Sequence, residues 1–188
     1  MATFGNEDIE ASTFSIEDTV RGTLFSCPAV GVADSIDFVA YVSNANTKIK
    51  AMLYNADRTL LGTTDETIFG SLHTYDWRTV TFSAPKPNLA IANYYITAWA
   101  DDTTYTKADT TTGTCVLDPE VYDGPPNPVD ADTNTRTYSM HCNYTPGGAG
   151  VTVKKGSSLA STMTQMLNSK MLFDFRNRMP KLVPRQVT

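Results

Sequence analysis

Four aromatic residues fall in or beside segments whose turn-forming residues predict loops: Tyr75, Trp77, Tyr105 and Tyr122. An aromatic ring offers a flat apolar face, and in Tyr and Trp it also carries a polar group at its edge. Such rings can stack on the faces of sugars, so we treat these four as candidate glycan-binding residues. The alternative is that Trp77 and Trp99 fill the core and that the tyrosines are ordinary surface residues.

Acidic side chains concentrate in the expected loops as well. Carboxylates in irregular loops suit calcium, which prefers hard oxygen ligands, and two carboxylates across a cleft would suit glycoside hydrolysis. The sequence has no EF-hand pattern, and acids in loops are commonly just solvated. We therefore predict no metal centre and keep a structural calcium ion open as an alternative. The acids concerned are Asp101, Asp102, Asp118, Glu120, Asp123, Asp130 and Asp132.

Catalysis requires a nucleophile, a base and their partners at suitable spacings, and the sequence contains none of these patterns. The chain has 2 histidines, His73 and His141. His141 directly precedes Cys142, and neighbours on a strand point to opposite faces, so they cannot form a dyad. Among the three cysteines no metal-ligand spacing occurs; Cys115 and Cys142 could pair, or all three could be free thiols. We predict a protein that is not an enzyme, with no catalytic residues and no cofactor.

The elements that must position these residues are strands. Segments of alternating apolar and polar residues, separated by turn chemistry, cover 19–26, 35–43, 47–54, 59–63, 76–83, 93–101, 112–117 and 136–144. About eight such strands, with no helical interval between them, predict an all-β, antiparallel, jelly-roll-like β-sandwich, with a closed barrel as the alternative. Segment 118–134 is rich in Pro and Asp, which predicts a long exposed loop.

The alternation also predicts which side chains face the core. In 35–43, Asp37 and Tyr41 lie on the outer face, and the opposite face carries Ile36, Phe38, Ala40 and Val42. In 47–54, Lys48 and Lys50 lie outside, opposite Ile49, Ala51 and Leu53. The segment 93–101 is apolar on both faces, with Tyr94, Ile96, Ala98 and Ala100 on one and Tyr95, Thr97 and Trp99 on the other.

Charge divides the chain at a glycine-rich segment. Residues 1–150 hold 8 Lys and Arg against 19 Asp and Glu, a balance of −11, and residues 151–188 hold 7 against 1, a balance of +6. We therefore predict a β-sandwich body over 1–146, a glycine hinge at 147–150 and a basic C-terminal arm over 151–188.

The arm combines a short predicted helix with a basic end. Its apolar residues repeat at helical spacing after Ser157 and Ser158, which can cap a helix. A helix this short is marginal in water alone, so we expect its Leu and Met face to pack against an acidic surface, such as another copy of the body. A solvated tail is the alternative. The arm residues concerned are Leu159, Met163, Met166, Leu167, Lys170, Phe173, Phe175, Arg176, Arg178, Lys181 and Arg185.

Several segments of the body resemble a known group of proteins. The elements are TFG at the start, Leu53-Tyr54, Leu60-Leu61-Gly62, Trp77 to Phe82, Pro87 to Leu89, and Tyr94 to Trp99. Together they resemble β-sandwich modules of phage and prophage genomes and of extracellular proteins, of the choice-of-anchor or carbohydrate-binding-like type. The resemblance covers about residues 3–145, does not reach the arm, and implies a virion or surface protein without its own signal peptide.

Localisation and partners follow from the same features. The N-terminus is acidic and lacks an apolar run, so we expect no signal peptide, and no stretch is apolar enough for a membrane span. We expect no nucleic acid partner, because the acidic body repels phosphate and the basic arm lacks a stacking platform. Asn143 begins a formal glycosylation sequon.

Two functions remain, and both place the protein in a virion or an extracellular assembly. The first is a structural assembly protein, such as a phage capsid-decoration or tail protein or an extracellular filament subunit, whose arm docks on a neighbouring subunit. The second is a glycan-binding module that attaches its carrier to a carbohydrate surface. The sequence favours assembly, because the arm is its least generic feature.

Overall fold

The alternating segments fold into strands of one large antiparallel sheet. The computed structural model describes residues 1–147, and these contain 13 strands and no helix. The all-β antiparallel class is therefore confirmed. The strands are β1 (Ala2–Gly5), β2 (Ser12–Ser15), β3 (Thr19–Cys27), β4 (Gly31–Val42), β5 (Thr47–Asn55), β6 (Leu60–Thr63), β7 (Thr67–Phe69), β8 (Leu72–Thr81), β9 (Asn88–Leu89), β10 (Ala92–Ala100), β11 (Thr104–Pro119), β12 (Ala131–Tyr138) and β13 (Met140–Pro146).

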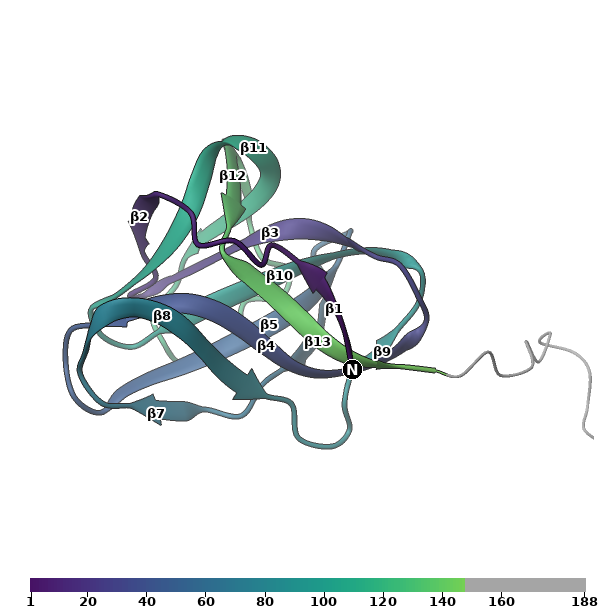
Figure 1. Cartoon of the computed structure of the whole chain (residues 1–188), viewed down its shortest axis with the longest axis horizontal. Coiled ribbons are helices and arrows are strands. Elements are labelled where there is room, and N and C mark those ends of the chain that lie inside the picture. Colours follow the sequence, from purple (N-terminus) through teal and green to yellow (C-terminus); the bar gives the residue numbers. More distant parts are fainter. Residues whose placement is uncertain (148–188) are drawn as a thin grey trace, which may run out of the picture. The chain divides into compact units, whose positions relative to one another are not determined.

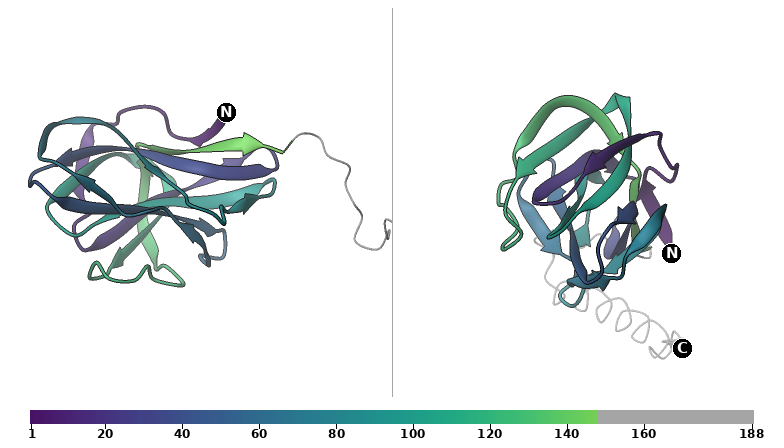
Figure 2. Two further views of the ribbon diagram at one scale, coloured as in Figure 1. Left: turned by 90° about the horizontal axis from the view of Figure 1, so that it is seen from below. Right: turned by 90° about the vertical axis from the view of Figure 1, so that its left-hand side faces the viewer.

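The sheet folds back over itself, and β11 makes the turn. The strand order is β1-β13-β4-β11-β3-β10-β5-β6; in addition β8 and β9 pair with β4, β2 and β12 with β11, and β7 with β5. The start of β11 pairs with β4, where Thr104 lies opposite Val42, and its end pairs with β3, where Cys115 lies opposite Thr23. In Figure 1, β4, β8 and β13 consequently lie in front of β5 and β10, and Figure 2 shows the same arrangement from two other sides.

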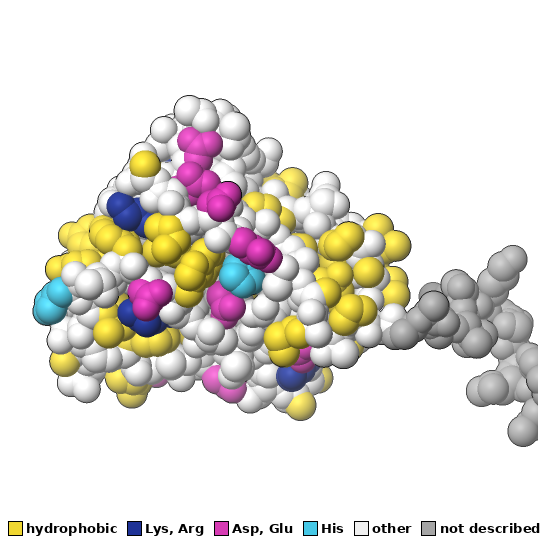
Figure 3. Space-filling view, viewed as in Figure 1, with side chains coloured by type: hydrophobic (Ala, Val, Ile, Leu, Met, Phe, Trp, Pro, Cys, Tyr) yellow, Lys and Arg dark blue, Asp and Glu magenta, His cyan; other side chains and the backbone are white. Residues whose placement is uncertain are grey.

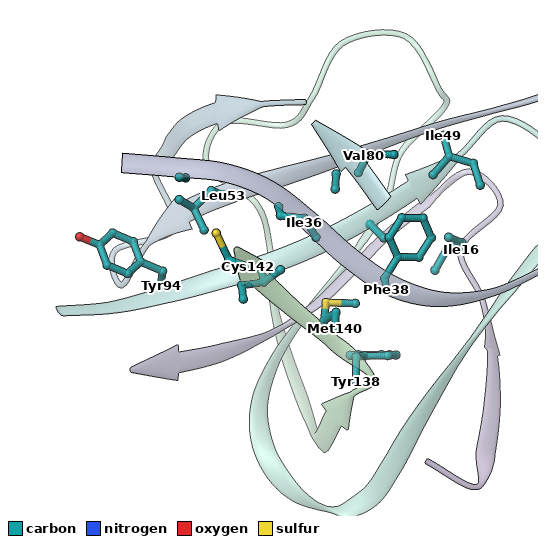
Figure 4. Close-up of a cluster of buried hydrophobic side chains, with 14 of the residues drawn as sticks. Ile16, Ile36, Phe38, Ile49, Leu53, Val80, Tyr94, Tyr138, Met140 and Cys142 are labelled. Carbon is teal, nitrogen blue, oxygen red and sulfur yellow. The ribbon is translucent and has the colours of Figure 1, made fainter. Parts of the chain in front are cut away.

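The main core lies between the two parts of the folded sheet. The inward faces predicted for 35–43 and 47–54 are confirmed, because all their members are fully buried there. Residues from strands far apart in the order meet in this core: Ile36 and Phe38 of β4, Leu53 of β5 and Met140 of β13 (Figure 4). Removing these side chains from water supplies the main driving force for closing the sheet.

A second buried cluster lies on the other face of β3, β5 and β10. It contains Val20, Met52, Tyr54, Tyr95, Trp99, Val116 and Val129. Both faces of β10 are thus buried, as its sequence predicts.

Residues 120–130, which we call the strap, cover this second cluster. Val129 is fully buried, and its N–H donates to the carbonyl of Arg58 at 3.2 Å. The Tyr54 hydroxyl donates to Pro126 O at 3.0 Å, and the Trp99 indole N–H donates to Glu120 O at 3.1 Å. The prediction of a long exposed loop over 118–134 is right in part. Residues 120–130 form no strand, and all of them except Val129 are exposed or partly exposed, but the ends of the segment belong to β11 and β12 and its middle closes a hydrophobic cluster.

Several other expectations about the elements need correction. β1, β2, β7 and β9 were not predicted, and β11 extends well beyond the predicted 112–117. The predicted strand 136–144 is interrupted at Ser139, which separates β12 from β13. Most of the predicted hinge, the short helix and the whole basic arm lie outside the described residues.

Candidate functional site

The outer surface of β4, β8, β11 and β13 carries six aromatic side chains, which we call the aromatic face. It comprises Tyr41, His73, Tyr75, Trp77, Tyr105 and His141. Strand register explains how they meet: Tyr105 of β11 lies directly opposite Tyr41 of β4, and Trp77 of β8 lies opposite Val39. Cross-strand partners project from the same side of a sheet, so the alternation that buries Phe38 and Ala40 turns Tyr41 outward.

A bulge in β8 concentrates the aromatic rings around Tyr41. Ala40 pairs with Asp76 and Val42 pairs with Leu72, so the three residues from His73 to Tyr75 oppose the single residue Tyr41. Bulges bend a strand and redirect its side chains, and they occur often beside functional sites. Here the bulge brings two rings of β8 to one ring of β4.

Tyr41 is the centre of the resulting ring cluster. Its ring centroid lies 5.4 Å from that of Tyr75, 5.8 Å from His73 and 6.2 Å from Tyr105, all in tilted arrangements. Its hydroxyl is hydrogen-bonded to His73 Nδ1 at 3.2 Å. Tilted pairs at these separations are favourable and contribute about 0.5–1.5 kcal/mol each beyond area burial. The rings therefore hold one another in fixed orientations.

Lys107 of β11 fixes the position of Tyr75. Its ammonium lies 4.2 Å from the centroid of the Tyr75 ring, and it donates to Ala11 O at 2.9 Å and to Thr13 Oγ1 at 3.1 Å. The Tyr75 hydroxyl donates to the same Thr13 Oγ1 at 3.3 Å. β2 and β11 thus anchor a ring that belongs to β8.

Trp77 continues the aromatic face toward β13. Its ring lies 4.9 Å from that of His141, whose Nε2 is 3.1 Å from Asp37 Oδ2. Asn143 Nδ2 donates to the same carboxylate oxygen at 2.9 Å. Burial alone would raise the pKa of Asp37, but the hydrogen bonds from His141 and Asn143 outweigh it and hold the pKa below its ordinary value. The carboxylate therefore stays ionised and orients the imidazole beside Trp77.

Some polar atoms of the aromatic face make hydrogen bonds within the protein, and others have no hydrogen-bond partner in the described residues. Hydrogen bonds within the described chain occupy the hydroxyls of Tyr41 and Tyr75. Between residues 1 and 147 we find no partner for the Tyr105 hydroxyl, the Trp77 indole N–H or Nε2 of His73. These free groups surround the fixed central rings. A ligand on this face would meet flat rings in the middle and hydrogen-bonding groups at the edge.

The four predicted glycan-binding residues do not all lie together. Tyr75, Trp77 and Tyr105 belong to the aromatic face. Tyr122 lies in the strap, where its ring packs on Trp99 at 4.7 Å and Lys50 Nζ stands 4.8 Å from the ring centroid. Burial and the nearby negative charges of Glu66 and Asp101 raise the pKa of Tyr122.

The tryptophans also take different roles. Trp99 is fully buried in the second cluster, whereas Trp77 remains partly exposed. The interpretation of both as core residues is thus right for Trp99 only. The predicted arm residues lie outside the described part of the chain.

The acidic loops and the cysteines form no metal site in the described region. Residues 1–147 contain no group of three or more His, Cys, Asp or Glu side chains able to hold a metal ion. Cys27, Cys115 and Cys142 are buried free thiols. The pairing of Cys115 with Cys142 that the sequence left open is therefore not formed. No described helix is long and apolar enough to cross a membrane.

Sequence reasoning missed Tyr41, His73 and Lys107 as members of the site. The alternation in 35–43 placed Tyr41 on the outer face, which was the available signal. No local sequence pattern predicts the bulge that brings His73 and Tyr75 to Tyr41, because the bulge depends on the register between β4 and β8. No protein-family model matches the sequence, and no curated protein is significantly similar to it.

Proposed function

We propose that the protein is a non-enzymatic attachment protein that binds glycans through its aromatic face. The observation that carries this proposal is that two predicted glycan-binding residues, Tyr75 and Tyr105, pack on Tyr41. The third, Trp77, projects from the same side of the sheet, because it lies opposite Val39, two residues before Tyr41. Tyr41 and Lys107 hold the rings of Tyr75 and Tyr105, and the Trp77 ring packs on His141, so binding would order few side chains. Free hydrogen-bonding groups at the edge of the rings suit the hydroxyls of a sugar.

The proposed affinity is modest and fits a protein present in many copies. A few stacked rings, each contributing on the order of 1 kcal/mol, give dissociation constants of about millimolar. Weak sites become effective when several copies engage one surface together. We interpret the folded sheet as a jelly-roll-like sandwich, an architecture that supports both binding and assembly.

A glycan array tests the proposal directly. The intact protein should bind a set of glycans, and the variants Trp77→Ala and Tyr105→Ala should each lose about fivefold in affinity for them. Ile68→Ala is the matched control, because Ile68 is 61% exposed and lies on β7, away from the aromatic face. Absence of binding to every glycan would refute the function, as would equal losses in all three variants.

We propose structural assembly as a second function, because residues 1–150 carry a net charge of −11 and residues 151–188 carry a net charge of +6. In this proposal the arm of one copy docks on the acidic body of a neighbour, in a virion (as a phage capsid-decoration or tail protein) or in an extracellular filament. Such head-to-tail contacts generate rings or filaments. Light scattering on a chain lacking residues 151–188 should then give a folded monomer while the full chain oligomerises, and identical assembly of both chains would refute it.

A further inference from the structure

We infer that the aromatic face selects an anionic saccharide, one that carries a carboxylate or a sulfate group on the sugar ring. This inference rests on the proposed glycan-binding function and adds the chemical class of the ligand. It follows from the hydrogen-bonding groups that the face leaves free and from the charges that stand beside it.

The free groups of the aromatic face are able to donate. The Trp77 indole can only donate, the Tyr105 hydroxyl can donate, and a His73 imidazole that accepts the Tyr41 proton at Nδ1 carries its own proton on Nε2. A hydroxyl of a neutral sugar also needs acceptors, and carboxylates are the strongest ones in proteins. A carboxylate or sulfate group on a sugar, in contrast, requires donors only.

The two carboxylates next to the rings are already engaged. Asp37 accepts from Asn143 and is paired with His141. Asp76 accepts the N–H of Trp77 at 2.8 Å and lies 3.6 Å from Arg78. Asp76 is also exposed, but it lies opposite the inward-facing Ala40 and so projects from the other side of β8 than Trp77. The face itself therefore has surplus donors.

Lys107 supplies positive charge without a counterion. Among the described residues, five other basic side chains lie within 4.0 Å of a carboxylate, and Lys107 does not. Its ammonium stands over the ring of Tyr75, one of the rings packed on Tyr41. Because Ala11, Thr13 and the Tyr75 ring already surround this ammonium, it acts on a ligand through its charge. The five paired side chains are Lys48, Lys50, Arg78, Lys86 and Arg136.

Both histidines of the chain belong to the same face. Figure 3 shows them on one side of the molecule, with hydrophobic side chains between them. His141 already faces Asp37, whereas His73 has only the Tyr41 hydroxyl as a partner. Hydrogen bonds from such groups to an ionised ligand are roughly twice as strong as those between neutral groups.

The acidic body does not conflict with an anionic ligand of small size. Interactions between exposed charges are screened over about 8 Å at physiological salt. A single ligand carboxylate beside Lys107 therefore senses mainly the local charge. A long polyanion such as nucleic acid would also meet the acidic surroundings.

The test compares two ligands that differ only in charge. An oligogalacturonate and the same oligomer with methyl-esterified carboxyls are titrated into the full chain by calorimetry, and a sulfated oligosaccharide is compared with its desulfated form. The charged member of at least one pair should bind about tenfold more tightly, and added salt should reduce the preference. The pair that shows it identifies the carboxylate or the sulfate as the anion.

Variants connect the preference to Lys107. In Lys107→Gln the charged and uncharged ligands should bind with nearly equal affinity. In Lys107→Arg, which keeps the positive charge, the preference for the anion should persist, and this variant controls for loosening of β2. It should also persist in Lys86→Gln, whose ammonium pairs with Asp34 at 2.7 Å away from the aromatic face. Equal binding of charged and uncharged members, or a preference unaffected by Lys107→Gln, overturns this inference and leaves the glycan-binding function standing. Absence of binding to every glycan overturns both.

Discussion

Truncating Val129 in the strap should destabilise the whole β-sheet domain. Val129 is fully buried against the second cluster, which includes Tyr54 and Trp99. Val129→Ala removes two methyl groups, each worth about 0.8 kcal/mol of transfer free energy, and leaves a small cavity. We expect the free energy of unfolding to fall by about 2 kcal/mol. With a urea dependence of about 2 kcal/mol/M, the unfolding midpoint should fall by about 1 M.

The assay is equilibrium urea unfolding followed by tryptophan fluorescence, since Trp99 lies under the strap. Val121→Ala is the matched control, because Val121 belongs to the same segment but is 69% exposed. A surface substitution of this kind should change stability by less than about 0.5 kcal/mol. If both variants lower the midpoint equally, or neither does, the strap is not a packing element and our account of the second cluster fails.

Three further predictions concern other parts of the domain. Folding lowers the pKa of Asp37, so its ionised form stabilises the protein above the unfolded pKa of about 3.9, and this contribution disappears as the pH falls through the folded pKa. Asp37→Asn should therefore lower the free energy of unfolding by about 1–3 kcal/mol at pH 7. It should also flatten the acid side of the profile of stability against pH, which is measured by unfolding at several pH values. Gly113 has a φ of +95° and no room for a Cβ beside the carbonyl of Arg136. Gly113→Ala should therefore lower the Tm by roughly 5 °C in calorimetry. An unchanged Tm would contradict this account. Burial raises the pKa of Cys115 to about 11 and also raises the pKa of Cys27 and Cys142. A thiol reagent should therefore label all three cysteines only after unfolding. Labelling of the native protein would contradict their burial.

Sequence periodicity predicted the long strands because each has a side chain pattern that burial enforces. The alternation of 35–43 and 47–54 matches the observed core, and the two apolar faces of 93–101 match two separate clusters. The missed strands β1, β2, β7 and β9 contain two to four residues, which is too short for a pattern to appear. They become strands only because a longer neighbour offers free hydrogen-bonding groups.

The packing of the strap on the second cluster was missed because the composition of the segment reports only local preferences. Pro and Asp residues rule out a regular strand, but they do not decide whether the segment lies on a hydrophobic surface. That outcome depends on the outer face of β10, where Tyr95 and Trp99 need a cover. No local signal separates Val129 from Val121, since both are β-branched residues among acids and prolines and Val121 is 69% exposed.

Tyr75 and Tyr122 show why residue type alone could not define the site. Both are tyrosines near turn-forming residues, and the sequence assigns them the same role. Tyr122 belongs to a segment that crosses an apolar surface, so its ring contributes to a core beside Trp99. Tyr75 lies in a bulge of β8, and its ring meets Tyr41 and the charge of Lys107. Whether an aromatic ring is available to a ligand is thus decided by what lies across the sheet from it.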